Sequence, residues 1–327
     1  MTDPNRRARL AASTLGACTP WPMLARAQTF PEKPVRLAVG YAPGTAPDVL
    51  ARMLGIKLGD LLKQQVVVDN RARAGGQIAA QNVAKSAPDG YSLRPGEVGS
   101  IAIAPPAFSK LPYDPAEEFV GIGAVARVDF LLVVPTKSPH ATVAEFVKAA
   151  KAQNEKLNFA TFGAGTSGHF GAELLGEATG FKVEPIHYRA TGDAVNAIIA
   201  GDVAAAFVSA ALGVAQIKAG KMRALATTAP QRSALLPDVP TFSEAGLPKI
   251  DISAWFAVMA PAGTSPAVLD LLNRQTVSAM NAPETRTKII EAGFSVFGTG
   301  RADTERMLRA EAQRWAAVVQ ARGFKAD

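Results

Sequence analysis

The sequence has 327 residues, 48% of them hydrophobic, and a formal net charge of +7 at pH 7. No apolar run is long enough to cross a bilayer as a helix, so we expect a soluble chain whose core is large enough for two lobes. The Lys and Arg residues are scattered among acids and do not form an aromatic-interleaved basic face, which argues against nucleic acid binding.

The first 27 residues differ from the rest of the chain. Three arginines precede a weakly apolar stretch, and Ala25-Arg26-Ala27 offers a small-x-small cleavage site before Gln28. These features are typical of a secretory signal peptide, so we expect a periplasmic protein that is cleaved near Ala27. The paired arginines leave a twin-arginine route open beside the general secretory (Sec) route, and Leu15-Gly16-Ala17-Cys18 leaves a lipoprotein route open.

Removal of residues 1–27 also changes the chemistry of the chain. Four arginines and Asp3 leave, so the formal charge falls to +4, from 31 basic and 27 acidic residues. The single cysteine, Cys18, leaves with them. The mature chain then has no disulfide and no thiol chemistry, which is compatible with the periplasm.

Short β-rich runs alternate with helical runs along the rest of the chain, as is typical of parallel sheets covered by helices. We expect strands at 35–41, 66–68, 130–134, 158–162, 183–188, 203–209, 223–228, 252–259 and 294–297. Another strand begins at Tyr91 and should be cut short, because Pro95 cannot donate to a ladder. We expect helices from near residue 47 to 62, through 78–84, at 142–151, up to 179, and at 193–200, 266–280, 283–292 and 301–322.

This alternation divides the mature chain into two α/β units, with strand-like crossings near Val128 and Ala254. We expect a first lobe from residues 28–128 and 254–327 and a second lobe from residues 129–253, hinged around a cleft. In such sheets, ligands bind at the carboxyl ends of the strands, where turns lead into helix N-termini.

The stretch Tyr41–Asp48 joins the first predicted strand to the helix that begins near Pro47. Gly44 permits tight turning, Pro47 suits the first helical position, and Asp48 favours the positive helix start. The unpaired backbone N–H groups of such a turn can hold an anion without a basic side chain. The alternative is an ordinary strand-to-helix turn.

Residues Gly163–Gly168 read G-x-G-x-x-G between a predicted strand and a predicted helix, and Glu184 follows at nearly the interval of a dinucleotide-binding unit. A dinucleotide-dependent enzyme is therefore an alternative. Against it, Glu184 stands at the start of its strand and not at the end that would meet a ribose, and no catalytic pair is evident. We favour a second anion-holding turn that faces the first across the cleft.

The remaining polar candidates carry weaker signals. Ser167 is not in a nucleophile elbow, because His169 stands where the last glycine is needed. The three histidines lack metal-ligand spacing, so we expect no metal site, and only His169 is expected near the pocket. Arg94, Glu97 and Arg189 follow predicted strands and should reach the cleft edge, although a plain surface position is the default for each charged residue.

A series of short motifs then occurs in a fixed order along the mature chain. They are Phe30-Pro31-Glu32-Lys33-Pro34-Val35-Arg36, Tyr41-Ala42-Pro43-Gly44, Val66-Val67-Val68-Asp69-Asn70-Arg71, Ala74-Gly75-Gly76, Pro88-Asp89-Gly90-Tyr91, Leu111-Pro112-Tyr113-Asp114-Pro115 and Leu236-Pro237-Asp238-Val239-Pro240-Thr241. This series resembles the Bug (TctC-like) family, the extracytoplasmic substrate-binding components of tripartite tricarboxylate transporters. No single motif is diagnostic, so the resemblance depends on their number and order.

The resemblance implies a two-lobed α/β Venus-flytrap fold, each lobe a mainly parallel sheet flanked by helices, with no catalysis and no cofactor. A small carboxylate would bind between the lobes, and the partners would be the membrane subunits of a tripartite tricarboxylate-type transporter, with the chain a monomer. A ligand sensor that feeds a membrane signalling partner stays an alternative. By position, the ligand-binding residues would be Tyr41, Ala42, Pro43, Gly44, Thr45, Asp48, Gly99 and Ser100 in the first lobe and Gly165, Thr166, Ser167, His169, Arg189 and Ser209 in the second.

The chain departs from the family's pattern in the expected pocket. The departures are Thr45 in place of a glycine, Pro47 before Asp48, Arg94-Pro95-Gly96-Glu97-Val98 where an apolar strand and two asparagines are common, Arg189-Ala190 in place of Lys-Gly, and Ser209 in place of a frequent aspartate. These substitutions leave open whether ligand binding is redirected or lost.

Overall fold

The computed structural model describes residues 30–72, 76–153 and 155–325. The predicted signal peptide lies outside these residues, and Pro31–Asp327 forms a compact unit of its own. Within the part of the chain that the structure describes, no helix is both long and apolar enough to span a membrane.

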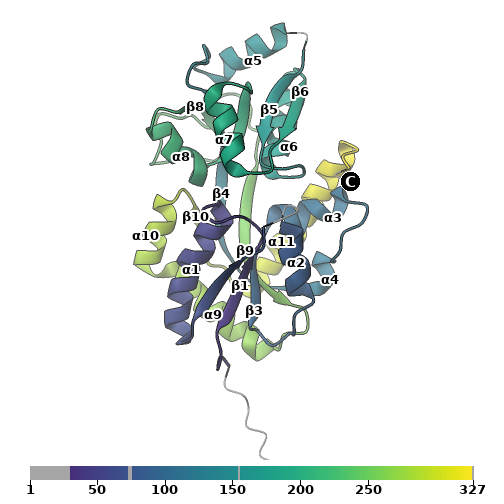
Figure 1. Ribbon diagram of the computed structural model, residues 1–327, viewed down its shortest axis with the longest axis vertical. Coiled ribbons are helices and arrows are strands. Elements are labelled where there is room, and N and C mark those ends of the chain that lie inside the picture. The colour runs from purple at the N-terminus through teal and green to yellow at the C-terminus, as the bar shows by residue number, and fades with distance from the viewer. Residues whose placement is uncertain (1–29, 73–75, 154, 326–327) are drawn as a thin grey trace, which may run out of the picture. The chain divides into compact units, whose positions relative to one another are not determined.

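Strands and helices alternate along the described chain (Figure 1). The strands are β1 (Val35–Val39), β2 (Val66–Asn70), β3 (Ser92–Glu97), β4 (Phe119–Pro135), β5 (Leu157–Thr161), β6 (Val183–His187), β7 (Ala205–Ser209), β8 (Met222–Thr227), β9 (Ser253–Pro261) and β10 (Ser295–Val296). The helices are α1 (Ala46–Leu62), α2 (Gln77–Ala84), the π-helix η2 (Gly99–Ile103), α3 (Ala104–Ala107), α4 (Pro115–Glu118), α5 (Val143–Ala152), α6 (Ser167–Thr179), α7 (Thr191–Ala200), α8 (Ala210–Lys218), α9 (Pro266–Asn281), α10 (Pro283–Glu291) and α11 (Arg301–Ala321).

The strands pair in the order β2-β1-β3-β9-β4-β7-β5-β6, and β8 and β10 each pair with β4 as well. The strands β1, β2 and β3 are parallel to one another, as are β5, β6 and β7, whereas β9 is antiparallel to both β3 and β4. We call the part that contains β1–β3 the first lobe and the part that contains β5–β8 the second lobe (Figure 1).

Strand β4 passes through both lobes without interruption. Its residues Phe119–Asp129 pair with β9, and its residues from Phe130 to Pro135 pair with β7 and β8. The strand expected to begin at Phe130 therefore begins at Phe119. The partner of β4 changes next to the predicted lobe boundary, although the residue limits of the lobes stay a prediction.

The strand directions bring the carboxyl ends of the two sets of parallel strands toward each other. Because β3 and β4 both run antiparallel to β9, β3 points toward the second lobe, while β7 runs against β4 and points toward the first. The last residue of β3, Glu97, is level with Phe256 and hence with Ala126 of β4, whereas the last residue of β7, Ser209, is level with Phe130. At about 3.3 Å per residue, these two edges are about 13 Å apart along β4.

The expectation that Pro95 cuts the third strand short is wrong. Strand β3 continues to Glu97, and Pro95 is paired with Val258 of β9. The pairing with β1 ends at Leu93, so Pro95 faces a partner on one side only. In an antiparallel ladder, alternate residues direct their N–H away from the partner, and a proline fits at such a position without loss of a hydrogen bond.

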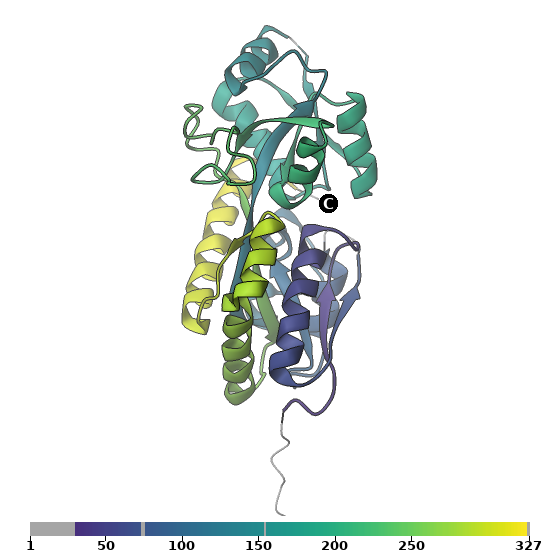
Figure 2. The same ribbon diagram turned by 90° about the vertical axis from the view of Figure 1, so that its left-hand side faces the viewer.

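Helix α11 packs against elements of both lobes. It packs against η2 and lies beside β4, where Figure 2 shows it in yellow, and Trp315 packs against Phe170 of α6 with ring centroids 5.6 Å apart. Just beyond α11, the ring of Phe324 lies 5.0 Å from that of His169 and 5.2 Å from that of Phe170. The end of the chain therefore supports the helix that follows the second glycine-rich loop. The helices η2, α3, α4 and α8 were not predicted.

A close backbone approach fixes the start of the first loop. Gly40 follows β1, and a Cβ atom added to it would lie 2.4 Å from the Cα atom of Gly76, just before α2. Only a residue without a side chain permits this approach, so Gly40 positions the loop that begins at Tyr41.

We expect Gly40→Ala to lower the free energy of unfolding by about 2 kcal/mol or more, because backbone atoms must move to admit the methyl group. Gly192→Ala is the matched control, since Gly192 lies in the first turn of α7 with no atom within 4 Å of an added Cβ. The control should be neutral or slightly stabilising, because alanine favours the helix by up to about 1 kcal/mol. Urea unfolding midpoints measure both, and equal effects would contradict the packing argument.

Candidate functional site

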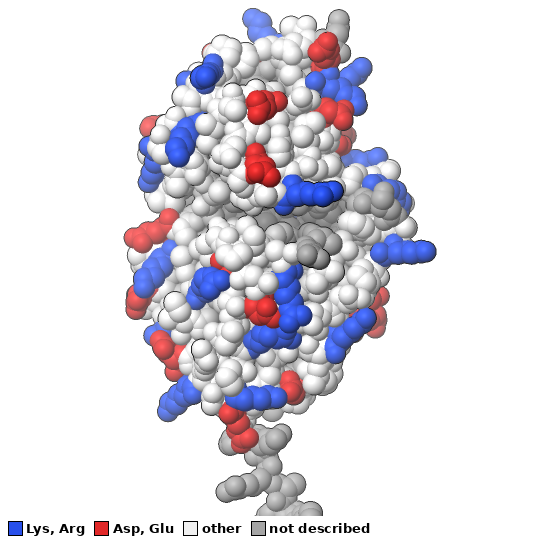
Figure 3. Space-filling model, viewed as in Figure 1, with Lys and Arg blue, Asp and Glu red and all other residues white. Residues whose placement is uncertain are grey.

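Five of the strand-to-helix connections at the two facing edges contain the predicted site residues. The first lobe contributes the segments after β1 and β3, and the second lobe contributes those after β5, β6 and β7. The space-filling view shows a cleft across the molecule between the two lobes, and basic and acidic side chains are interspersed over this face (Figure 3). The predicted site residues all belong to these five connections or to the helices that they start.

In the first loop, Asp48 is a structural residue. Its side chain is only 2% exposed, and its carboxylate accepts hydrogen bonds from the N–H of Gly44 (2.8 Å) and from Asn70 (2.8 Å) and pairs with Arg52 (2.9 Å). Burial acts to raise the pKa of Asp48, but the hydrogen bonds from Arg52, Gly44 and Asn70 outweigh it, so the pKa lies below its usual value. Asp48 thus shapes the loop and has little capacity left for a ligand.

Thr45 occupies its position without strain. Its backbone is extended, with φ of −77°, and its hydroxyl donates to the carbonyl of Ala42 at 2.6 Å. The residue that needs glycine is Gly44, with φ of +81°. No hydrogen bond joins the N–H of Ala46 or Asp48 to another described residue, so the start of α1 keeps two backbone donors.

After β3, the predicted donors of Gly99 and Ser100 are already occupied. The carboxylate of Glu97 accepts the N–H of Gly99 at 2.5 Å and that of Ser100 at 2.9 Å. The hydroxyl of Ser100 accepts from Arg94 at 2.6 Å, and its carbonyl accepts from Tyr113 at 2.7 Å. Ser100 is therefore part of a buried polar cluster.

Arg94 lies inside this cluster, 1% exposed, over the ring of Phe119 at 5.6 Å. Its Nε and Nη1 atoms have no hydrogen bond partner, and no described carboxylate lies within ion-pair distance of it. Burial lowers the pKa of Arg94, while nearby Tyr113 and Glu97 oppose that shift. Burial and then Glu97 raise the pKa of Tyr41, whose phenol therefore stays protonated and can donate.

The second glycine-rich loop adopts the conformation that its glycines allow. Gly163 and Gly165 have φ of +121° and +72°. The hydroxyl of Thr166 donates to the carbonyl of Gly163 (2.9 Å) and accepts the N–H of His169 (3.4 Å), which caps α6. Ser167 is 4% exposed, and its hydroxyl has no hydrogen bond to any described residue. The N–H groups of Ser167 and Gly168 are likewise without an acceptor among the described residues.

His169 connects the loop to the C-terminal segment. Its Nδ1 accepts the N–H of Gly165 at 3.1 Å, so a neutral ring carries its proton on Nε2, which lies 3.6 Å from Glu173. Glu173 lies in turn 3.6 Å from Arg322, beyond α11. The hydrogen bond with His169 is the largest cause of the lowered pKa of Glu173. His169 is buried at 2% exposure and acts as a strut for the loop.

The connections after β6 and β7 leave two polar residues available. Arg189 is exposed and has no hydrogen bond or ion pair with any described residue. Ser209 is half-buried and precedes α8 without capping it through its side chain. His187, which ends β6, lies 2.6 Å from Thr161 through Nδ1 and 4.9 Å from the ring of His169. Burial lowers the pKa of His187, and nearby His169 lowers it further.

The position of Glu184 argues against the dinucleotide-binding alternative. Glu184 pairs with Lys156 at 2.6 Å and is the second residue of β6, away from the edge where a ribose would bind. Among the described residues, no group of three His, Cys, Asp or Glu side chains is placed to hold a metal ion.

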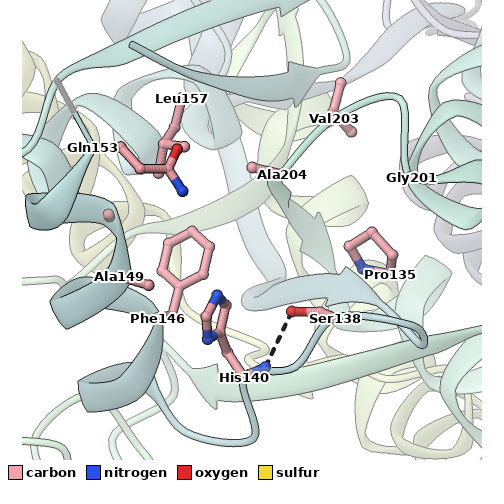
Figure 4. A pocket seen from close by; sticks show the side chains of 11 residues that line it. Pro135, Ser138, His140, Phe146, Ala149, Gln153, Leu157, Gly201, Val203 and Ala204 are labelled. Carbon is pink, nitrogen blue, oxygen red and sulfur yellow. Dashed lines mark hydrogen bonds between the residues drawn. The ribbon is translucent and has the colours of Figure 1, made fainter. Parts of the chain in front are cut away.

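A separate hollow of about 180 Å³ lies at the far end of β4, where none of the predicted site residues is found (Figure 4). Pro135, the last residue of β4, lines it together with His140 and Phe146. The hydrogen bond drawn in Figure 4, from the N–H of His140 to Ser138 (3.3 Å), lies within the loop before α5. Because its walls belong to one lobe, this hollow is distinct from the cleft.

The structure thus separates the predicted residues by role. Asp48, Gly99, Ser100, Thr166 and His169 bind other parts of the protein, whereas the start of α1 and the group Ser167, Arg189 and Ser209 keep free donors. The contacts of Glu97 with Gly99 and Ser100 were missed, although its place at a strand end was predicted. Phe324 was missed because no local pattern connects it to a loop some 160 residues earlier.

Residues 50–324 match the family described as tripartite tricarboxylate transporter family receptor. The protein BugT of Bordetella pertussis is 35% identical over 300 residues, which are 91% of this chain and 92% of BugT.

Two solved structures agree in fold. The R. palustris protein Rpa4515, solved with adipate, superposes with a TM-score of 0.86 at 30% identity, over 90% of this chain and 99% of that one. MatC from Rhodopseudomonas palustris, solved with malate, gives 0.82 at 29% identity, over 89% and 100%. The predicted two-lobed α/β fold and the resemblance to the Bug family are confirmed. The chain belongs to the tripartite tricarboxylate transporter receptor family, whose relatives are periplasmic solute-binding proteins and not enzymes.

Proposed function

We propose that this chain captures a small organic carboxylate between its two lobes and delivers it to the membrane subunits of a tripartite tricarboxylate-type transporter. The observation that carries the proposal is the pair of facing strand edges, each ending in loops with uncommitted hydrogen-bond donors. Adipate and malate, present in two solved relatives, are both small carboxylates.

In this proposal, the second lobe provides the main carboxylate-binding group. Ser167 offers its hydroxyl and its N–H, Gly168 offers its N–H, and the exposed guanidinium of Arg189 lies at the same edge, after β6. Backbone donors at a helix start and a guanidinium are the donors that bind carboxylates most strongly. The helix dipole of α6 contributes about 0.3–1 kcal/mol more at an exposed site.

The protein would act as a monomer after export and removal of residues 1–27. The mass of the protein isolated from the periplasm would test whether these residues are removed. A ligand sensor with a membrane signalling partner would use the same closing lobes, and the genes beside this one would separate the two roles.

Thermal denaturation with a panel of carboxylates tests the binding itself. A ligand at a hundred times its dissociation constant stabilises the folded state by about 2.7 kcal/mol. Absence of any shift at millimolar concentrations would contradict the proposal.

Substitutions of the adjacent residues Ser167 and Thr166 should affect ligand affinity and folding stability separately. Ser167→Ala should weaken carboxylate binding about three- to tenfold and leave stability unchanged, because this hydroxyl has no internal partner. Thr166→Ala removes the cap of α6 and should lower the free energy of unfolding by about 1 kcal/mol. Titration calorimetry and urea unfolding of both variants measure the two effects. Loss of stability in Ser167→Ala without loss of affinity would show that the hydroxyl is structural.

Arg189→Gln should weaken binding about tenfold, because a charged hydrogen bond to the ligand carboxylate is lost. It should also reduce the dependence of affinity on salt concentration. Arg286→Gln is the matched control, since Arg286 is an exposed residue of α10 without an ion pair among the described residues. Titrations at two salt concentrations measure both variants. Equal loss in both would mean that the net charge matters and not the position of Arg189.

A further inference from the structure

The turn that ends α11 fixes the position of Phe324. The N–H of Gly323 donates to the carbonyl of Gln320 at 3.1 Å, and the N–H of Phe324 donates to the carbonyl of Val319 at 3.3 Å. Gly323 has a positive φ of +57°. These two bonds around a left-handed glycine are a common way to end a helix. The backbone of the turn therefore sets the direction in which Phe324 leaves α11.

Phe324 contacts both partners of the hydrogen bond that shapes the second glycine-rich loop. In this bond, the N–H of Gly165 donates to Nδ1 of His169 at 3.1 Å. The ring of Phe324 lies 5.0 Å from the ring of His169, centroid to centroid, in an edge-to-face arrangement. Its Cε1 atom would lie 4.0 Å from a Cβ atom added to Gly165, so the ring also lies next to the loop backbone.

Ion pairs attach the same turn to α6. Arg322, the residue before the glycine, lies 3.6 Å from Glu173 and also pairs with Glu177. The side chain of Arg322 is only 15% exposed, and a mostly buried cation is screened less by salt than an exposed one. The turn is thus held against α6 by charge as well as by ring contacts.

The helix that presents this turn belongs to the first lobe. Helix α11 packs against η2 and α3, and a Cβ atom added to Gly121 of β4 would lie 2.9 Å from the side chain of Thr304 on α11. The segment η2 follows β3 directly, at the first-lobe edge of the cleft. A helix of the first lobe therefore supports the glycine-rich loop of the second.

We propose that Phe324 is a positioning residue of the carboxylate-binding loop, which holds the His169 ring in place and, through it, the backbone from Gly165 to Gly168. This rests on the proposed function, because the ligand carboxylate is assigned to Ser167 and Gly168. Without the Phe324 ring, His169 can rotate and its bond with Gly165 can open. The N–H groups that follow then point less directly at a carboxylate, and hydrogen bonds weaken steeply when they are misaligned.

Phe324→Ala tests the role of the side chain. The affinity for malate and adipate, measured by titration calorimetry, should fall about three- to tenfold because the loop donors are less well oriented. The N–H of Gly165 should exchange with solvent at least about tenfold faster, while the amides of β7 exchange as in the wild type. Phe324→Leu, which keeps part of the apolar bulk, should restore part of both effects.

Unchanged affinity or unchanged exchange at Gly165 in a folded Phe324→Ala protein would overturn the proposal. Exchange that is faster in β7 to the same degree would also overturn it, because it would indicate a general loss of stability. If Phe324→Ala does not fold, Phe324→Leu takes its place in both measurements. If neither ligand binds the wild type, the proposed function fails, and exchange at Gly165 alone decides whether Phe324 positions the loop.

A matched pair of glycines tests the turn. Gly220 ends α8 with the same two bonds, from Gly220 to Ile217 and from Lys221 to Gln216, and has φ of +68°. Neither Gly220 nor Gly323 has an atom within 4 Å of an added Cβ. Both Gly→Ala variants should lower the urea unfolding midpoint similarly, because alanine disfavours positive φ.

Only Gly323→Ala should also weaken the binding of malate and adipate, by about threefold, since only this turn presents Phe324. Gly220→Ala should bind both ligands as the wild type does. Equal affinities in the two variants would show that the turn does not hold Phe324 against the loop, and the proposal would be wrong.

Discussion

The antiparallel ladder between β4 and β9 is the constraint on which the arrangement of the site depends. It pairs Phe119–Asp129 with Ser253–Pro261. Because β3 joins the same ladder from one side and β7 continues it from the other, the directions of both sets of parallel strands are fixed relative to one axis. Their carboxyl ends must then face each other across a short length of β4, and the loops that follow them become the two sides of one cleft.

The same ladder limits how the cleft can change its width. Any closing movement must bend β4 between its pairing with β9 and its pairing with β7 and β8, and it must also carry α11, whose end packs against α6. The ladder is already irregular, with register shifts between Gly121 and Gly123 and between Ala124 and Ala126. Such irregularities increase strand twist locally. They lie in the first lobe, whereas Ala126–Asp129 pairs with Ser253–Phe256 without a register shift.

The alternation of strands and helices was readable from the sequence because each buried face repeats with the period of its element. The two loops were also readable, since Gly44, Gly163 and Gly165 occupy left-handed positions that other residues avoid. The continuity of β4 could not be predicted from the sequence. Phe130–Val134 and the residues before it pair with different strands, but their hydrophobic pattern is the same. Nor was the contact of Phe324 with His169, which depends on where α11 ends in space.

The departures in β3 make physical sense only as a pair. Glu97 places a negative charge among buried groups, and Arg94 places a positive charge there, although two of the Arg94 donors have no partner among the described residues. Burial of an uncompensated charge is far more costly than burial of two opposite charges. Ser100 lies between them, since it accepts from Arg94 through its hydroxyl and donates to Glu97 through its N–H. Arg94, Ser100 and Glu97 therefore form one buried polar cluster after β3, while the start of α1 and the second-lobe edge keep free backbone donors.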